Sequence, residues 1–133
     1  MLKLREYEDL AGKNAYRLWF DSIDVQLAVR VTTILERIAA GHKSSIEPVG
    51  EGVSEYKNDI GAGLRIYFGK DGDQLVILLG GGTKKTQSKD IEAAKELWRE
   101  YKAVKRAEQM KAAQQAKAAA DKGKLKNKKK KGR

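Results

Sequence analysis

An arginine and a tyrosine two residues apart are the first side chains in this sequence with an evident chemical use. Residues 64–68, LRIYF, read as a β-strand, and a period of two places Arg65 and Tyr67 on one face and the apolar side chains on the other. A core needs the apolar face but has no need of an arginine beside a tyrosine. We therefore expect this pair to face a ligand, and a guanidinium suits phosphate because its fork donates two parallel hydrogen bonds.

Lysines near this strand extend the candidate site. Lys84 and Lys85 follow a run of glycines, Gly80–Gly82, which we expect to form a turn where the backbone can approach a ligand. Lys84 could bind phosphate as a cation, or act as base or acid if neighbouring cations lower its pKa. Lys57, in a strand predicted over residues 54–59, is a second candidate base.

Each candidate also has a purely structural interpretation. Arg65 could pair with Glu55 or Asp59 at the surface, Tyr67 could cover part of the sheet, and the lysines could simply be solvated. Histidine is a common general base, but the only histidine, His42, lies in a predicted loop with no identified partner.

Helices are expected on both sides of these strands in the sequence. A short helix is predicted over residues 14–20, and a second begins after Ser22 or Asp24, both plausible N-caps, and ends near Gly41. The second helix has apolar residues at helical spacing: Leu27, Val31, Ile34, Leu35 and Ile38. Residues 2–7 could form an edge strand or an extended arm.

A hairpin follows, with strands over residues 64–68 and 74–79 and a turn at Gly69–Asp73. The second strand is apolar without alternation, which is typical of a strand covered on both faces. A last helix begins near Thr86 or Ser88 and carries an apolar stripe to Val104. Thr86 and its neighbour Gln87 could contact RNA, although capping this helix is the simpler role for the threonine.

The predicted fold class is α+β. We expect a small, mainly antiparallel sheet with two N-terminal helices and a C-terminal helix, the helices lying on one face. The other face should be partly open and should carry Lys57, Arg65 and Tyr67, with Lys84 and Lys85 at its rim.

The net charge of +10 comes from one end of the chain. Residues 1–102 contain 16 Lys/Arg and 16 Asp/Glu, whereas residues 103–133 contain 12 and 2. We therefore predict a folded domain over 1–102 and a Lys/Ala-rich basic extension over 103–133. Alanine, lysine and glutamine favour helix, so the extension should be helical to about Ala120 and disordered over residues 123–133. Its cations could bind RNA or another polyanion without sequence preference.

The remaining composition favours a soluble cytoplasmic protein. There is no cysteine, no apolar signal region at the N-terminus and no apolar run long enough to span a bilayer. No dense cluster of metal-ligating residues is evident, and the glycine run lacks the spacing of a phosphate-binding Walker loop. We expect no metal, no small-molecule cofactor and no membrane partner.

One family shares this order of motifs. The pattern Gly61, Gly63, Arg65-Ile66-Tyr67, followed after an apolar strand by Gly81-Gly82, Lys84, Thr86-Gln87 and Asp90-Ile91, resembles the addiction-module killer proteins of the RelE/ParE toxin superfamily, of the HigB/RelE-like kind. Trp19–Ser22 and Pro48–Glu55 resemble the same family upstream, so the resemblance covers about residues 1–102. Leu64, Thr83 and Lys85 depart from its usual residues.

The resemblance implies a RelE-like fold and a toxin of a type II toxin–antitoxin system. The implied activity is that of a ribosome-dependent mRNA endoribonuclease, in which a ribose 2′-hydroxyl attacks the adjacent phosphate without a metal. Arg65, Lys84 and Lys57 would be the catalytic residues, and Tyr67, Lys85, Thr86 and Gln87 would bind RNA. The implied partners are mRNA on the ribosome and a cognate antitoxin of helix-turn-helix type, whose binding would end the inhibition of translation.

Two other functions fit the same sequence. The chain could be a toxin that inhibits a protein target such as DNA gyrase, which would need no cleavage chemistry. It could also be a non-catalytic RNA-binding module whose affinity comes from residues 103–133.

Overall fold

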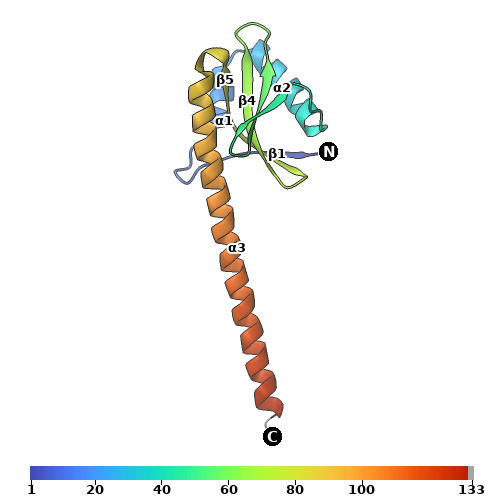
Figure 1. Ribbon diagram of the computed structural model, residues 1–133, viewed down its shortest axis with the longest axis vertical. Helices are drawn as coiled ribbons and strands as arrows, with labels where there is room; N and C mark the ends of the chain where they lie inside the picture. Colours follow the sequence, from blue (N-terminus) through green and yellow to red (C-terminus); the bar gives the residue numbers. More distant parts are fainter. Residues whose placement is uncertain (132–133) are drawn as a thin grey trace. The chain divides into compact units, whose positions relative to one another are not determined.

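The computed structural model of the protein describes residues 1–131 (Figure 1). The chain divides into a compact unit over Met1–Tyr101 and a second unit that begins at Lys102. The elements in chain order are β1 (Lys3–Glu6), α1 (Ala15–Ser22), α2 (Val25–Ala39), β2 (Ile46–Gly50), β3 (Val53–Asn58), β4 (Leu64–Asp71), β5 (Leu75–Thr83), the 3₁₀ turn η1 (Lys84–Thr86) and α3 (Gln87–Lys131).

A mixed sheet forms the centre of the first unit, with strand order β1-β5-β4-β3-β2. β1 runs parallel to β5, and the other neighbours are antiparallel. The predicted fold class, α+β with a mainly antiparallel sheet, two N-terminal helices and a C-terminal helix, is therefore confirmed. β2 was not predicted, because its sequence IEPVG contains a proline and a terminal glycine and lacks the apolar alternation of a strand.

The two N-terminal helices cover one face of the sheet. Asp24 caps α2 by accepting a hydrogen bond from the backbone N–H of Leu27, as one of the two predicted caps. The predicted apolar stripe of α2 packs on alternate residues of β4 and β5, which reach this face because of the period of two. The buried residues of this core are Tyr16, Val31, Ile34, Ile38, Tyr56, Leu64, Ile66, Phe68, Val76 and Leu78.

Helix α3 covers the opposite face, so the prediction of a partly open face is wrong. Trp98 and Tyr101, with Ala94, pack against Tyr67 and the outward residues of β5. The indole of Trp98 lies flat against Gly69, where a Cβ would meet ring carbons at 2.5 and 2.6 Å. The unalternating apolar run of β5 was the sequence signal for this second layer, since such a strand is buried from both sides.

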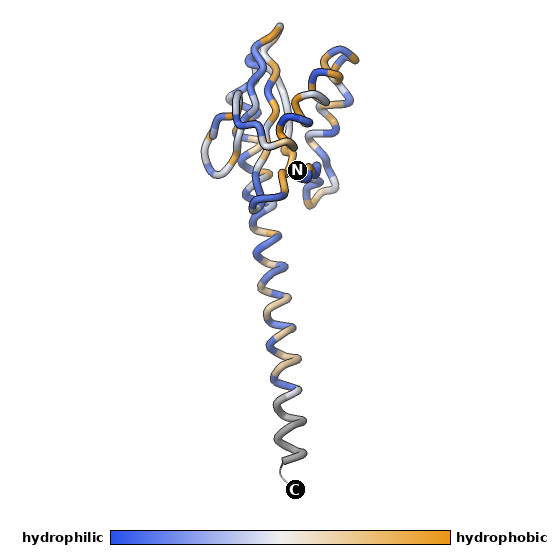
Figure 2. The backbone as a smooth tube through the Cα atoms, turned by 90° about the vertical axis from the view of Figure 1, so that its right-hand side faces the viewer, coloured by the Kyte–Doolittle hydropathy of each residue, from blue (hydrophilic) through white to orange (hydrophobic). Residues whose placement is uncertain are grey.

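Beyond Tyr101, α3 carries mostly hydrophilic residues interleaved with alanines (Figure 2). The helix continues to Lys131, past the end predicted near Ala120 and through most of the segment predicted to be disordered. Lysine and leucine favour helix, and a lone glycine costs only about 1 kcal/mol. Residues 132 and 133 lie outside the described part of the chain. Within residues 1–131, no helix combines the length and the apolar character that crossing a bilayer requires.

Candidate anion-binding site

Strands β3 and β4 place four polar side chains together on the face that α3 covers. Lys57 lies directly opposite Arg65, and Glu55 lies opposite Tyr67. Residues directly opposite on one face of an antiparallel pair have Cβ atoms about 5 Å apart. These four residues, the strand quartet, include Lys57, Arg65 and Tyr67 from the predicted site and Glu55, which was considered only as a possible ion-pair partner.

Arg65 is held between a loop carboxylate and its own strand. Nη2 lies 2.9 Å from Oδ1 of Asp59, and Nη1 donates to the carbonyl of Leu64 at 3.1 Å. The arginine side chain is only 4% exposed, whereas that of Asp59 is 76% exposed. The sequence predicted the guanidinium on an open face, but it is buried. The exposed carboxylate of Asp59 separates it from solvent. Its buried Nε has no hydrogen-bond partner.

Glu55 is fully buried and connects the sheet to the start of α3. Its Oε2 accepts a hydrogen bond from Nε2 of Gln87 at 2.8 Å, and its Oε1 lies 3.7 Å from Nζ of Lys57. The half-buried Gln87 is thus engaged with a protein carboxylate and not with solvent. Burying a lone carboxylate is costly, and the Gln87 hydrogen bond with the nearby Lys57 charge offsets part of that cost. Among the described residues, Oε1 has no hydrogen-bond partner.

Lys57 is better placed as a fixed cation than as a base. Its Nζ lies 2.8 Å from Oε2 of Glu47, and this hydrogen bond raises the pKa of Lys57 above its usual value. A raised pKa keeps the amine protonated at neutral pH. The prediction that Lys57 serves as a general base is therefore not supported by its surroundings, while a role in binding or in donating a proton is compatible with them.

Tyr67 is a core residue and not the outward RNA-contacting residue that its parity suggested. It is completely buried beneath α3; its hydroxyl lies near the Glu55 carboxylate, but no described residue meets hydrogen-bond geometry with it. Burial raises the pKa of Tyr67, and the negative charges of Glu55 and Asp90 raise it further. A ring in this position cannot stack on a base unless α3 moves away.

The glycine run before Lys84 is the end of a strand and not a turn. Gly80–Gly82 belong to β5, and two of them make room for larger groups: the Trp19 ring lies against Gly81 and the Asp90 carboxylate against Gly82. Asp90 also accepts a hydrogen bond from the hydroxyl of Thr86. Gly81 and Gly82 are thus explained by packing on the two faces of the sheet, whereas nothing crowds Gly80.

Gly63 lies between Lys84 and Arg65 and is close to both residues. The backbone N–H of Lys84 donates to the carbonyl of Gly63 at 2.8 Å. A Cβ added to Gly63 would lie 2.9 Å from Cβ of Lys84 and 3.6 Å from Nη1 of Arg65. Three predicted cations, Lys57, Arg65 and Lys84, therefore gather at one corner of the sheet, which we call the cation corner. Lys85 and Thr86 are exposed on η1 beside it.

The other candidates lie elsewhere. His42 is exposed and lines a pocket of about 260 Å³ with Ile38, Phe68 and Val76, which belong to the face of the sheet opposite Arg65. Within the described part of the chain, no group of three or more His, Cys, Asp or Glu side chains is arranged to hold a metal ion.

Of the two ion-pair partners considered for Arg65, Asp59 forms the pair and Glu55 does not. The parity of Glu55 was assigned correctly, but its face of the sheet was expected to be open. The signal that could have found Glu55 is the apolar stripe of α3, which needs a second sheet face to cover and so buries whatever that face carries.

No family model matches the chain. A search of curated proteins found an uncharacterized protein of Haemophilus influenzae that is 35% identical over 83 residues, which is 62% of this chain and 84% of that protein. The chain belongs to the same family as this Haemophilus influenzae protein.

Proposed function

We propose that the protein is the toxin of a type II toxin–antitoxin pair and acts as a ribosome-dependent mRNA endoribonuclease. The observation that carries the proposal is the cation corner, in which Lys57 lies opposite Arg65 and Lys84 adjoins Arg65 across Gly63. Attack of a 2′-hydroxyl on the adjacent phosphate builds negative charge on the phosphorus oxygens, and fixed cations stabilise that charge. The order of motifs that resembles the RelE/ParE superfamily supports the same assignment.

Asp59 indicates how RNA would enter this corner. A carboxylate on a guanidinium occupies the position that a phosphate oxygen would take, because both anions accept from the same fork. Asp59 is exposed, so it can leave Arg65 without disturbing the core. Binding of RNA would then exchange one anion for another at Arg65, with Lys84 and Lys85 at the exposed edge of the site.

The test is induced expression of the full chain, followed by mapping of RNA 5′ ends. We expect new ends in translated messages within minutes of induction. Lys84→Ala should reduce them with little effect on folding, since Lys84 is exposed, whereas Lys43→Ala, an exposed lysine outside the corner, should not. Arg65→Ala should abolish cleavage. If this variant does not fold, Arg65→Lys keeps the positive charge and tests whether cleavage needs the guanidinium itself.

The burial of Arg65 favours a second candidate function. A guanidinium that is 4% exposed is a poor phosphate ligand unless Asp59 departs, and a toxin that inhibits a protein target such as DNA gyrase needs no such ligand. Growth arrest with intact messages and a DNA-damage response would support this second function. An RNA affinity that depends on residues 103–133 and is indifferent to Arg65→Lys would indicate a non-catalytic RNA-binding module instead.

A further inference from the structure

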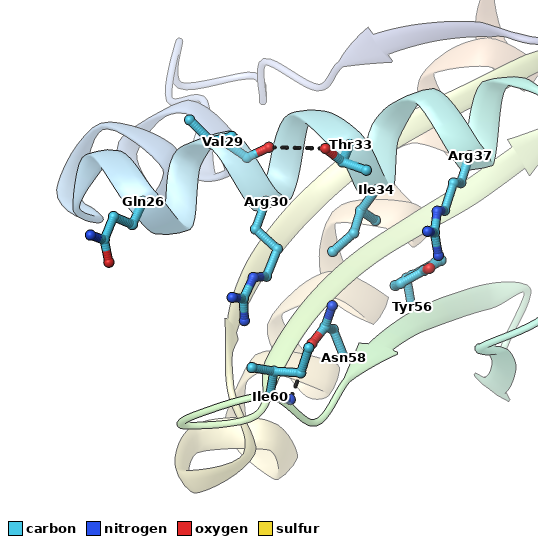
Figure 3. Close-up of a pocket in the computed structure, with 9 residues that line it drawn as sticks. All are labelled: Gln26, Val29, Arg30, Thr33, Ile34, Arg37, Tyr56, Asn58 and Ile60. Carbon is cyan, nitrogen blue, oxygen red and sulfur yellow. Dashed lines mark hydrogen bonds between the residues drawn. The ribbon is translucent and has the colours of Figure 1, made fainter.

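A groove separates α2 from the end of β3 on the face of the sheet opposite the cation corner (Figure 3). It has a volume of about 370 Å³. One wall includes Val29, Arg30 and Arg37 of α2, and the other is formed by Tyr56, Asn58 and Ile60. The helix residues recur at helical spacing and the strand residues at a period of two, so the groove follows both elements lengthwise.

The groove displays apolar side chains that the fold does not cover. Val29 on α2 is 63% exposed, and Ile60 on the strand wall is 62% exposed. Val25, one helical turn before Val29, is 79% exposed. Contiguous exposed aliphatic groups beside a cavity are typical of a surface that receives another chain.

The charges of the groove are of one sign. Arg30 and Arg37 reach from α2 toward the strand wall, and no acidic residue lines the groove (Figure 3). Among residues 1–123, whose side chains the structure describes, neither arginine has an ion-pair partner. They are seven positions apart in the helix, which is about 10 Å along the axis.

We propose that this groove docks an acidic, aliphatic peptide segment of a second protein. Its aliphatic side chains would cover Val29 and Ile60, and carboxylates about 10 Å apart would pair with Arg30 and Arg37. In a helix that separation is about two turns, and in an extended peptide it falls between spacings of two and four residues, which keep both side chains on one face. Charge complementarity of this kind selects the partner and orients it as it binds.

The groove is linked to the cation corner through one short segment. Asn58 and Ile60 line the groove, and Asp59 between them points to the other face and holds Arg65 at 2.9 Å. The Asn58 side chain also accepts a hydrogen bond from the backbone N–H of Ile60 at 3.1 Å, which fixes the turn. A peptide that immobilises Ile60 therefore holds Asp59 on Arg65. This consequence for activity rests on the proposed function, but the docking itself does not.

Docking can be tested with a fluorescein-labelled nine-residue peptide that has glutamate at every fourth position, so that the carboxylates share one face, and leucine or valine elsewhere. A version with glutamine in place of glutamate is the matched control. The full chain is titrated at about 0.3 M salt, where contacts with the basic extension are screened. We expect binding of the glutamate peptide to weaken roughly tenfold or more in the double variant Arg30→Glu/Arg37→Glu. The same charge change at exposed positions in α3, Arg106→Glu/Lys117→Glu, should leave it unaltered.

Chemical-shift mapping separates the remaining outcomes. Perturbed amides along residues 26–37 and 56–60 support the proposal. So does tight binding of a peptide with lysine in place of glutamate to the double variant Arg30→Glu/Arg37→Glu. Absence of binding, equal binding of the glutamine peptide, or perturbations confined to residues beyond 102 overturn it. The Nε–Hε signal of Arg65 should shift when the peptide binds; an unchanged signal removes the link to Asp59. None of these readouts depends on RNA cleavage, so the docking and the proposed function can fail separately.

Discussion

A single carboxylate determines whether the central arginine of the site is available to an anion. Asp59 is the ion-pair partner of Arg65, and it comes from a loop, whereas Arg65 is fixed in the sheet. Ion pairs with exposed members contribute about 1 kcal/mol, equivalent to about a fivefold change in affinity, and the exposure of Asp59 places its side of the pair on that scale. The free energy that Asp59 gains by pairing with Arg65 is therefore small. A change in the loop that carries Asp59 would be enough to alter the binding of a phosphate there.

Replacing Asp59 by asparagine should consequently favour RNA binding. We expect Asp59→Asn to tighten binding of a short RNA by up to about fivefold, because the neutral amide no longer competes for the guanidinium. Fluorescence anisotropy at fixed salt measures the effect. Asp73→Asn, which removes the same charge from an exposed turn, controls for the change in net charge. Equal effects of the two substitutions would show that Asp59 does not gate Arg65.

The buried tyrosines lead to a second prediction, which concerns the stability of the fold at high pH. Burial is the main cause that raises the pKa of Tyr7, Tyr16, Tyr67 and Tyr101, to about 12 for Tyr16 and Tyr101. In the unfolded chain these phenols ionise near pH 10. Their contribution to stability is therefore complete below pH 10 and is lost as the pH rises through 12. We expect unfolding by circular dichroism to coincide with cooperative tyrosinate absorbance at 295 nm; phenols that titrate near pH 10 in a folded chain would contradict this.

The first turns of α3 complete the core of the domain. Trp98 lies flat on Gly69 and stacks on Tyr101, with ring centroids 5.0 Å apart and an interplanar angle of 8°. Trp98→Ala should therefore lower the free energy of unfolding by about 3–5 kcal/mol, because it removes a large buried ring and leaves a cavity. Urea denaturation measures this loss. Met110→Ala, at an exposed position of the same helix, should change stability by less than about 0.5 kcal/mol.

The elements were largely predictable from the sequence, but the burial of the site was not. Period-two alternation assigned Arg65 and Tyr67 to one face correctly, because parity depends only on the strand itself. Whether that face meets water or a helix depends on where α3 docks, which is a property of the tertiary structure. Glu55 and Tyr67 were consequently expected outside and are fully buried. β2 was missed because it is a short strand at the edge of the sheet and contains Pro48.

The excess positive charge of the chain and the candidate site lie in different segments. Residues 1–102 carry equal numbers of acidic and basic side chains, and the excess of ten positive charges lies in residues 103–133. Under the proposed function, the local cations of the domain would position one phosphate, while the extension would attract polyanions without sequence preference through counterion release. These two contributions respond differently to salt, which allows them to be measured separately.

Removing residues 107–133 should reduce the salt dependence of RNA binding while the domain remains folded. The truncation leaves the half-buried Val104 and Lys105 in place, and the preceding residues through Tyr101 form a compact unit. The logarithm of the binding constant falls linearly with the logarithm of the salt concentration. Each cation that no longer contacts a single-stranded RNA reduces the magnitude of that slope by about 0.7. The slope should therefore fall by several units, while Lys84→Ala in the full chain lowers it by at most about one. An unchanged slope in the truncated chain would mean that the extension does not contact RNA, and that affinity resides in the domain alone.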